Sequence, residues 1–230
     1  MTLSVAGVWL AGIALSSLAV ASYLGPGYLP LGPSPSDAPY TIFSESNAPS
    51  VHPTRKVCLT CDLVRPARRV SHCRTCRRCV RDFDHHCPVL GTCVGRNNYL
   101  PYFAGLGSLS LATVLLAATS GVALGHSSFL LADGHKLTTA EWTRFGVWVA
   151  QTIVSLAMIP VAWLYCYHVQ LAARDMTTKE YESWGHPTGV LSWRHLARRL
   201  CATPLVPPHG RAGLAAVSLG VQAHSQQGRR

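Results

Sequence analysis

The chain has 230 residues, of which 48% are hydrophobic and only 13% are charged, and its formal net charge is +10. Charged residues are nearly absent from three long segments, which leaves little of the chain for a separate soluble globular domain. The positive charge does not indicate nucleic acid, because no recognition helix of zinc-finger spacing follows the cysteine pairs. The composition therefore predicts an integral membrane protein of the all-α class, with no nucleic-acid partner.

The first predicted element is a transmembrane helix over residues 1–24. No charged side chain occurs from Met1 to Ser36, and the apolar run matches the roughly 20 residues that cross a hydrocarbon core. Residues 19–21 resemble a signal-peptide cleavage site, so removal of the segment is an alternative. The segment lacks a positively charged start, and cleavage would deliver a thiol-rich segment into an oxidising compartment. A retained helix is therefore favoured.

A cysteine-rich segment over residues 55–99 follows a linker over residues 25–54, which is rich in Pro, Ser and Gly and has no helix or strand periodicity. The segment holds eight cysteine and histidine residues that suffice for two tetrahedral Cys3His zinc sites. These eight are Cys58, Cys61, His72, Cys73, Cys76, Cys79, His86 and Cys93. Because it is too dense in turns and ligands to build a hydrophobic core, we expect short hairpins whose folding depends on metal.

One cysteine of this segment is left over when the two zinc sites are filled. Cys87 follows Asp84, His85 and His86 directly, and a thiol next to an imidazole and a carboxylate has the composition of an activated nucleophile. Two alternatives remain open from the residues alone. His85 could be the zinc ligand in place of another histidine, and Cys87 could be a spare structural thiol.

Two more transmembrane helices are predicted over residues 100–125 and 145–172, joined by a loop over residues 126–144. The later helix contains Pro160, which spanning helices tolerate. The tail, residues 173–230, contains a possible short amphipathic helix and is expected to be disordered beyond Pro204. The side chains of that helix expected to face inward are Trp193 and Leu196. Those expected to face outward are Arg194, Arg198 and Arg199.

Isolated cysteine and histidine residues outside the cysteine-rich segment are expected to have structural and not catalytic roles. Cys166, in the third predicted span, is expected to be a small buried apolar residue. His168 has no other candidate ligand or catalytic residue near it in the sequence, and the same holds for His52, His126 and His135. All four histidines are expected to be loop or interface residues.

Positive charge is distributed unequally between the loops and predicts the orientation in the membrane. Of the 20 Lys and Arg residues, ten lie within residues 55–96 and eight lie from residue 174 onward, whereas only Lys136 and Arg144 lie between the second and third spans. The positive-inside rule then places the cysteine-rich segment and the tail in the cytosol, and the loop over residues 126–144 in the lumen. A basic cytosolic face would also attract anionic lipid headgroups.

The cysteine-rich segment resembles the cysteine-rich domain of the DHHC family of protein S-acyltransferases. The resemblance runs from Cys58 to Phe103. Its motifs are Cys58-x2-Cys61, His72-Cys73-x2-Cys76-x2-Cys79, Asp84-His85-His86-Cys87-Pro88, and Cys93-Val94-Gly95 with Asn98. After the third span, Thr177-Thr178-Lys179-Glu180 resembles the Thr-Thr-x-Glu motif of the same family.

The resemblance implies two interleaved structural zinc ions. One would be held by Cys58, Cys61, His72 and Cys79. The other would be held by Cys73, Cys76, His86 and Cys93. Each set is closed, with no open coordination position, so the metal is expected to support the fold and not to act as a Lewis acid.

The resemblance also implies a protein S-palmitoyltransferase that works in two steps. Cys87 would take a long-chain acyl group from acyl-coenzyme A, such as palmitoyl-coenzyme A, with His85 as base and Asp84 orienting the imidazole. A membrane-proximal cysteine of a protein substrate would then accept the acyl group. Thr178 would bond near Asp84, and the supporting residues would be Thr177, Thr178 and Glu180. The expected location is the membrane of the Golgi or endoplasmic reticulum.

Departures from the family pattern keep a second hypothesis open. Members usually have two spans before the zinc domain, whereas one is predicted here, which suggests a truncated or a compact form. Val89 stands where members usually have Trp, and Gly91-Thr92 stands where they have an Asn pair. The alternative function is therefore a catalytically weak relative that serves as a membrane-tethered interaction module.

Overall fold

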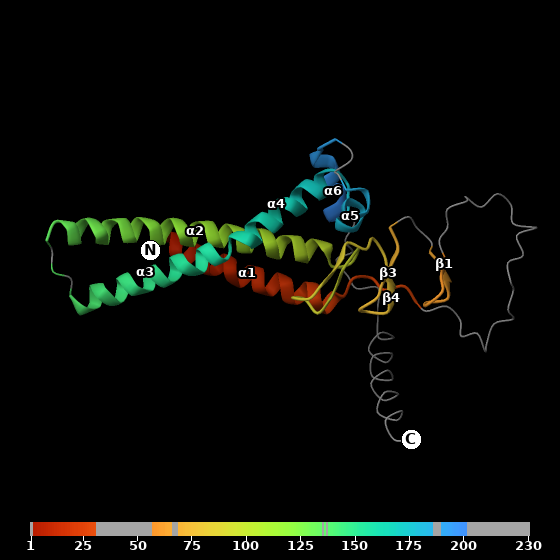
Figure 1. Ribbon diagram of the computed structural model, residues 1–230, viewed down its shortest axis with the longest axis horizontal. Coiled ribbons are helices and arrows are strands. Elements are labelled where there is room, and N and C mark those ends of the chain that lie inside the picture. Colours follow the sequence, from red (N-terminus) through yellow and green to blue (C-terminus); the bar gives the residue numbers. More distant parts are fainter. Residues whose placement is uncertain are drawn as a thin grey trace, which may run out of the picture.

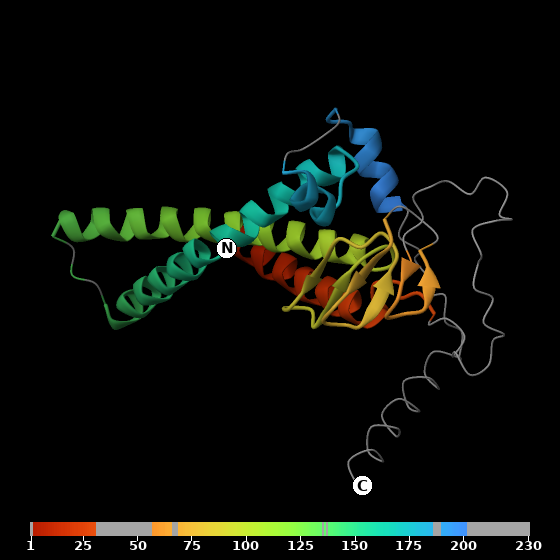
Figure 2. The same ribbon diagram turned by 45° about the vertical axis from the view of Figure 1, so that its right-hand side comes forward.

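The computed structural model describes residues 2–30, 57–65, 69–134, 136, 138–185 and 190–201. Long helices extend along one axis, and short β-hairpins gather at one end of them (Figures 1 and 2). Three helical segments are long and apolar enough to cross a membrane: Val5–Leu24, Tyr99–Ala132 and Thr139–Ala173. The hairpins lie between the first and second of these in the sequence, so the predicted fold class is confirmed. The linker beyond Pro30 and the tail beyond Pro204 lie outside the described residues.

Helices α1, Thr2–Leu24, and α2, Tyr99–Ala132, pack along each other. Gly105 of α2 permits their close approach, because a Cβ atom at this position would lie 2.8 Å from the Leu18 side chain. Small residues are typical of helix contacts in membranes, where close packing replaces the hydrophobic effect as the main attraction. The hairpin end of this helix pair carries the cysteine-rich segment.

The loop after α2 is shorter than predicted. Helix α2 continues to Ala132, beyond the expected end at residue 125, and helix α3, Thr139–Ala157, begins before the expected start at residue 145. The early start has a local cause in a capping box, in which the Thr138 N–H donates to Glu141 Oε2 at 2.8 Å and the Glu141 N–H donates to Thr138 Oγ1 at 3.4 Å. Much of the expected loop over residues 126–144 is therefore helical.

The third candidate span is divided into α3 and α4, Ile159–Ala173, at Met158. Pro160 lies in the first turn of α4. Proline is tolerated there because the first N–H groups of a helix have no intrahelical partner. The proline that the sequence placed inside one helix thus marks the start of a second one.

Three two-stranded antiparallel hairpins make up the cysteine-rich segment. They pair β1 (Val57–Cys58) with β2 (Leu63–Val64), β3 (Ser71–Cys73) with β4 (Arg78–Val80), and β5 (His85–Cys87) with β6 (Thr92–Val94). Their turns use left-handed backbone, with φ +47° at Asp62, +52° at Arg77 and +65° at Gly91. These tight turns place the cysteine pairs on short loops, as expected from the sequence.

The beginning of the predicted linker belongs to this segment. The Leu29 N–H donates to the Cys79 carbonyl at 2.8 Å, and the Arg81 N–H donates to the Gly27 carbonyl at 3.1 Å. Tyr28 forms a β-bridge with Val80. Residues 27–29 therefore pair with β4, although the sequence showed no strand periodicity there. Backbone pairing with an existing strand needs no side-chain pattern, which explains the difference.

Two short helices follow α4 near the hairpin end: α5, Thr178–Trp184, and α6, Trp193–Cys201. The predicted side-chain directions of α6 are wrong at two positions. Trp193 is 74% exposed, and the Arg199 side chain, expected to face outward, is only 9% exposed. The amphipathic pattern assumed that a basic side chain would seek solvent, whereas Arg199 has a buried partner described below. Leu196 faces inward, as expected.

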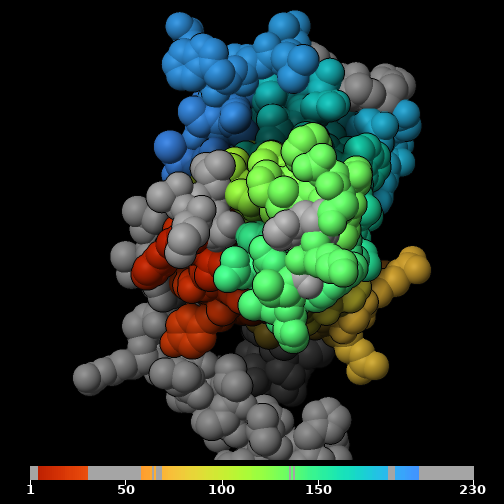
Figure 3. Space-filling view, turned by 90° about the vertical axis from the view of Figure 1, so that its left-hand side faces the viewer, coloured from red at the N-terminus to blue at the C-terminus, as the bar shows by residue number. Residues whose placement is uncertain are grey.

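Much of the helical surface is apolar. Exposed large side chains include Val122, Ile153 and Trp163, which suits contact with lipid. Cys166 of α4 is exposed as well, so its predicted burial inside the protein is wrong. Seen from the end opposite the hairpins, α2 and α3 (green) project toward the viewer and the segment with α6 (blue) lies to one side (Figure 3).

Candidate functional site

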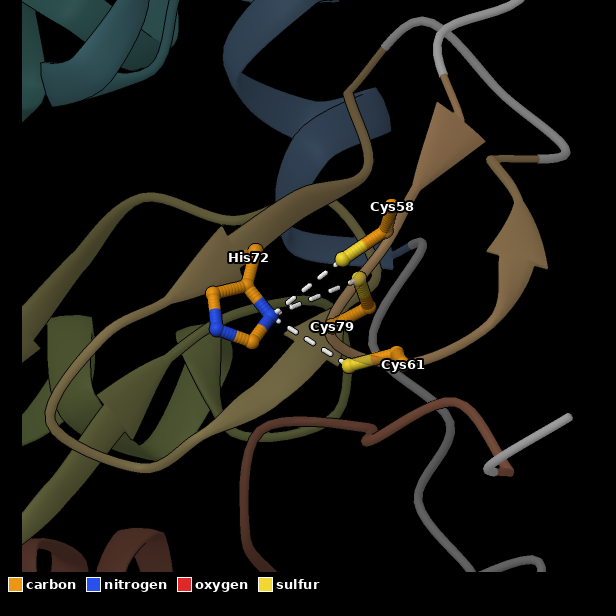
Figure 4. A group of neighbouring side chains, drawn as sticks. All are labelled: Cys58, Cys61, His72 and Cys79. Carbon is orange, nitrogen blue, oxygen red and sulfur yellow. Dashed lines mark hydrogen bonds between the residues drawn. The ribbon is translucent and has the colours of Figure 1, made fainter. Parts of the chain in front are cut away.

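The first Cys3His group gathers around His72 (Figure 4). Its Nδ1 atom lies 3.5 Å from Cys58 Sγ, 3.3 Å from Cys61 Sγ and 3.9 Å from Cys79 Sγ. Cys58 ends strand β1 and Cys61 lies in the turn that follows it, and Cys79 stands directly opposite His72 in the β3–β4 register. Tetrahedral zinc with its usual bond lengths separates a sulfur and a nitrogen ligand by about 3.6 Å. The observed separations fit this geometry.

The second Cys3His group gathers in the same way around His86. The His86 Nδ1 atom lies 3.8 Å from Cys73 Sγ, 3.4 Å from Cys76 Sγ and 3.7 Å from Cys93 Sγ. His86 and Cys93 stand opposite each other in the β5–β6 register. Successive strand residues point to opposite faces, so β3 directs His72 to one group and Cys73 to the other. The two groups are interleaved through this strand.

Both groups have the chemistry of structural zinc sites. Each offers three sulfurs and one imidazole nitrogen, the soft donor set that zinc prefers, and within each group the ligand atoms lie within 4.8 Å of one another. All four positions are filled by protein, which leaves none for a substrate or water. Cys87 belongs to neither group.

Cys87 ends strand β5 next to a histidine–aspartate pair. His85 Nδ1 donates to Asp84 Oδ2 at 2.9 Å. His85 Nδ1, the nitrogen through which His72 and His86 face their cysteines, is thus occupied by Asp84, and His85 is in neither Cys3His group. Cys87 is largely buried, and it interacts with the His85 side chain. The three residues are thus brought together as a thiol, an imidazole and a carboxylate in series.

Asp84, His85 and Cys87 stabilise one another's charged forms. Burial alone raises the pKa of Cys87, but the hydrogen bonds from His85 and from the Leu90 N–H outweigh it and lower the pKa below that of a free thiol. Burial lowers the pKa of His85, yet the bonds to Asp84 and Cys87 raise it to about 9. This arrangement favours a thiolate beside an imidazolium.

Asp84 is held by groups from two other parts of the chain. Its side chain has 0% exposure. The Thr178 N–H donates to Oδ1 at 3.2 Å, the Thr178 hydroxyl donates to Oδ2 at 2.6 Å, and Arg199 Nη2 donates to Oδ1 at 2.6 Å. Burial raises the pKa of Asp84, but the hydrogen bond from His85 and the charge of Arg199 outweigh it, so the pKa lies well below the ordinary value. Asp84 is therefore a carboxylate.

The Thr178 contact depends on the start of α5. The Thr177 N–H donates to Glu180 Oε2 at 3.0 Å, and the Glu180 N–H donates to Thr177 Oγ1 at 3.0 Å, which forms a capping box. From the hairpin segment, Arg69 pairs with Glu180 at 3.1 Å and with the Asp175 carboxylate at 2.9 Å. The capping box and Arg69 together fix the turn that aims Thr178 at Asp84.

Sequence reasoning missed two residues that contact Asp84. His168 was expected at a loop or interface, but it is 1% exposed, and its Nδ1 lies 4.0 Å from Asp84 Oδ2. Its Nε2 lies 3.2 Å from the Tyr102 hydroxyl. A histidine within a membrane span is costly and signals function, and this cue could have identified it. For Arg199 the sequence offers no comparable cue.

Asp84, His85 and His168 also form a third group whose ligand atoms lie within 4.8 Å of one another. The Arg199 guanidinium at Asp84 Oδ1 disfavours a metal ion there, because two cations would compete for one carboxylate. Nearby, a small cavity of about 120 Å³ is lined in part by Arg69, Arg96 and Arg199. The carboxylates of Asp82 and Asp175 line the same cavity, and each of these three arginines is paired with a carboxylate.

The chain is similar in sequence to known palmitoyltransferases. The family model described as DHHC palmitoyltransferase matches residues 51–185. Palmitoyltransferase ZDHHC8 of Canis lupus familiaris is 34% identical over 183 residues, which is 76% of this chain and 22% of the relative. Palmitoyltransferase ZDHHC5-B of Danio rerio is 32% identical over 201 residues, which is 82% of this chain and 29% of the relative.

Palmitoyltransferase ZDHHC5 of Bos taurus is 30% identical over 201 residues, covering 83% of this chain and 27% of the relative. The chain thus spans between about a fifth and a third of the length of these curated relatives. The matched part includes the hairpins, the membrane-spanning helices α2, α3 and α4, and the Thr-Thr-x-Glu turn. The extent of this match, together with the two Cys3His groups, places the chain in the DHHC palmitoyltransferase family.

Proposed function

We propose that this chain is a protein S-palmitoyltransferase in which Cys87 is the nucleophile. One observation carries the proposal: Cys87 is the cysteine of the hairpin segment that belongs to neither Cys3His group, and it interacts with His85, which is bonded to Asp84. A lowered thiol pKa, a partner imidazole and an orienting carboxylate are the requirements of a cysteine nucleophile. The family match supports the choice of an acyl group as substrate.

In the first step, the Cys87 thiolate attacks the carbonyl carbon of an acyl-coenzyme A. The new bond joins sulfur to the acyl carbon, and the bond between that carbon and the coenzyme A sulfur breaks. The His85 imidazolium gives its proton to the leaving coenzyme A thiolate and becomes neutral. In the second step, the thiol of a protein substrate gives its proton to His85 and attacks the Cys87 thioester, which restores the Cys87 thiolate. Asp84 keeps its negative charge in both steps and stabilises the imidazolium whenever His85 carries the second proton.

Zinc bound at the two Cys3His groups would supply folding energy and rigidity to the hairpins. Of the residues that would bind zinc, His86 and Cys93 lie on the two strands of the hairpin that carries Cys87. Their fixed backbone limits the movement of the nucleophile. No reaction step requires an open metal position.

The proposed location of the reaction is the cytosolic face of a Golgi or endoplasmic reticulum membrane. The charge distribution supports this side for the hairpins and the tail. Cys87 belongs to the same hydrophobic cluster as Tyr102 and Phe103 of α2, so the nucleophile lies where the hairpins meet a spanning helix. An acyl chain bound among such helices gains about 0.8 kcal/mol for each buried methylene. A membrane-proximal cysteine of a protein would be the natural acceptor.

The proposal is tested by acyl-enzyme formation. Purified, zinc-loaded chain incubated with an alkyne-tagged palmitoyl-coenzyme A should acquire label that hydroxylamine removes, as expected of a thioester. Cys87→Ser should abolish the label, whereas Cys201→Ser, at an exposed cysteine of α6, should retain it. Folded, zinc-loaded wild type without label would instead favour the membrane-tethered interaction module.

The lowered pKa of Cys87 predicts a pH dependence of alkylation. A thiol with a lowered pKa stays ionised at a lower pH. As the pH is lowered, the rate at which Cys87 reacts with iodoacetamide should therefore fall at a lower pH than the rate for the free thiol of glutathione. His85→Gln removes the main group that lowers the pKa, and the midpoint should move upward. The measurement is peptide mass spectrometry of Cys87 alkylation between about pH 5 and pH 9. Equal midpoints for wild type and variant would contradict the proposed pairing.

A further inference from the structure

The C-terminal helix α6 places one arginine inside the protein, against the proposed catalytic carboxylate. The Arg199 side chain is 9% exposed, whereas Arg194 and Arg198 of the same helix are exposed. The guanidinium lies 4.3 Å from the centre of the Tyr99 ring. A buried cation is costly unless its N–H groups are paired. The burial of Arg199 therefore requires strong partners.

Arg199 has two such partners, a carboxylate and a backbone carbonyl. Nη2 donates to Asp84 Oδ1 at 2.6 Å, and Nη1 donates to the Met176 carbonyl at 2.6 Å. Met176 directly precedes Thr177 and Thr178, whose turn also binds Asp84. The rigid fork of the guanidinium thus joins the carboxylate to the chain that leads into α5.

The rest of α6 is docked on the same region. The Ser192 N–H donates to the Ala173 carbonyl at the end of α4, at 2.8 Å. Leu196 and Leu200 pack against the hydrophobic cluster that includes Cys87. Along a helix, positions 196, 199 and 200 share one face, so docking of the two leucines brings Arg199 to Asp84. The position of α6 and the position of the carboxylate are linked in this way.

We propose that Arg199 is a positioning residue for acyl transfer: it holds the Asp84 carboxylate in the orientation that aligns His85 with Cys87, so that transfer requires a docked α6. This inference rests on the proposed function. Without Arg199, the side-chain contacts of Asp84 Oδ1 would be reduced to the Thr178 N–H at 3.2 Å. Oδ2 would keep its bonds from the Thr178 hydroxyl and from His85, but Oδ1 would lose its short bond to a cation, and the plane of the carboxylate would be less firmly fixed relative to His85.

The test compares variants of the full, zinc-loaded chain with palmitoyl-coenzyme A as the probe. Arg199→Gln should lower kcat for acyl-enzyme formation at Cys87 by roughly tenfold or more, the effect expected from losing a hydrogen bond to a charged group. KM should change by less than about twofold, because Arg199 binds protein groups and not the acyl donor. Arg199→Lys should recover part of kcat, since an ammonium keeps the charge but not the fork. Arg194→Gln removes the same charge from the exposed face of α6 and should match wild type.

Each other outcome would overturn the inference. Unchanged kcat in folded Arg199→Gln would show that Asp84 needs no arginine. A raised KM with unchanged kcat would show that Arg199 binds the anionic part of the donor. If Arg199→Gln loses its zinc or does not fold, Arg199→Lys decides the question, because a kcat equal to wild type would contradict a role for the fork. Wild type that forms no acyl-enzyme would contradict the proposed function, and this inference with it.

Discussion

Replacement of His86 by alanine is expected to remove one zinc ion per chain and to abolish acyl-enzyme formation at Cys87. His86 Nδ1 lies within 3.8 Å of all three sulfurs of its group, on the strand that also carries Cys87. Structural zinc contributes about 10–16 kcal/mol to the folding of small zinc domains. A typical domain is stable by only about 5–15 kcal/mol, so the β5–β6 hairpin should not survive the loss.

Elemental analysis and labelling measure the two parts of this prediction separately. Wild type should contain close to two zinc ions per chain, as its two Cys3His groups allow, and His86→Ala close to one. Cys87→Ala is the matched control, because it alters the next residue but leaves both groups complete. It should keep both zinc ions while losing the label. His86→Ala protein that retains two zinc ions and normal labelling would contradict the assignment of the second group.

Replacement of Asp84 by asparagine should lower the rate of acyl-enzyme formation roughly 10⁴-fold, as expected when the orienting carboxylate of a catalytic triad is lost. Asparagine is nearly isosteric, but it removes the negative charge that faces His85, Thr178 and Arg199. The asparagine amide has one oxygen that accepts hydrogen bonds, but its NH2 group can only donate them. That NH2 group would face one of the N–H or O–H donors that now bind the carboxylate. The imidazole would lose its orientation, and the imidazolium its counter-charge.

Single-turnover labelling with saturating palmitoyl-coenzyme A measures this rate directly. Asp82→Asn is a suitable control, since it removes the same charge two residues earlier. The Asp82 side chain is half-exposed, and its Oδ2 lies 3.6 Å from Arg96 Nη1. Its backbone is left-handed, a conformation that asparagine also tolerates. This control should label at close to the wild-type rate. Equal rates for Asp84→Asn and wild type in zinc-loaded protein would exclude Asp84 from the reaction.

The spans and the candidate metal ligands could be predicted because their signals are local, whereas the division of the ligands into two groups was expected only from family resemblance. An apolar run of sufficient length forms a helix in a membrane whatever its neighbours are. Zinc ligands of each group come in closely spaced clusters, such as Cys73 and Cys76, and only a few donor types suit the ion. Element ends were harder to predict. The capping box at Thr138 starts the third span earlier than predicted, and Pro160 divides it into two helices, although both features can be recognised in the sequence.

Contacts between distant segments could not be predicted in the same way. The capping box of α5 follows from Thr177 and Glu180 alone, but the bond from Thr178 to Asp84 joins residues 94 positions apart and was expected only from family resemblance. Arg69 reaches Glu180 across 111 positions. Nothing in the local pattern of either residue specifies its partner.

The amino-acid sequence by itself indicated the membrane helices, the eight candidate zinc ligands and the leftover thiol beside a histidine and an aspartate, because each depends on side-chain chemistry over short stretches. The division of the eight ligands into two sets was expected only from family resemblance. Only the tertiary structure decided that Arg199 and His168 belong beside Asp84. Arg199 lies 115 positions from Asp84. A charged or polar side chain is expected to face solvent until a buried partner compensates the cost of desolvation, and the position of that partner is a property of the packed chain.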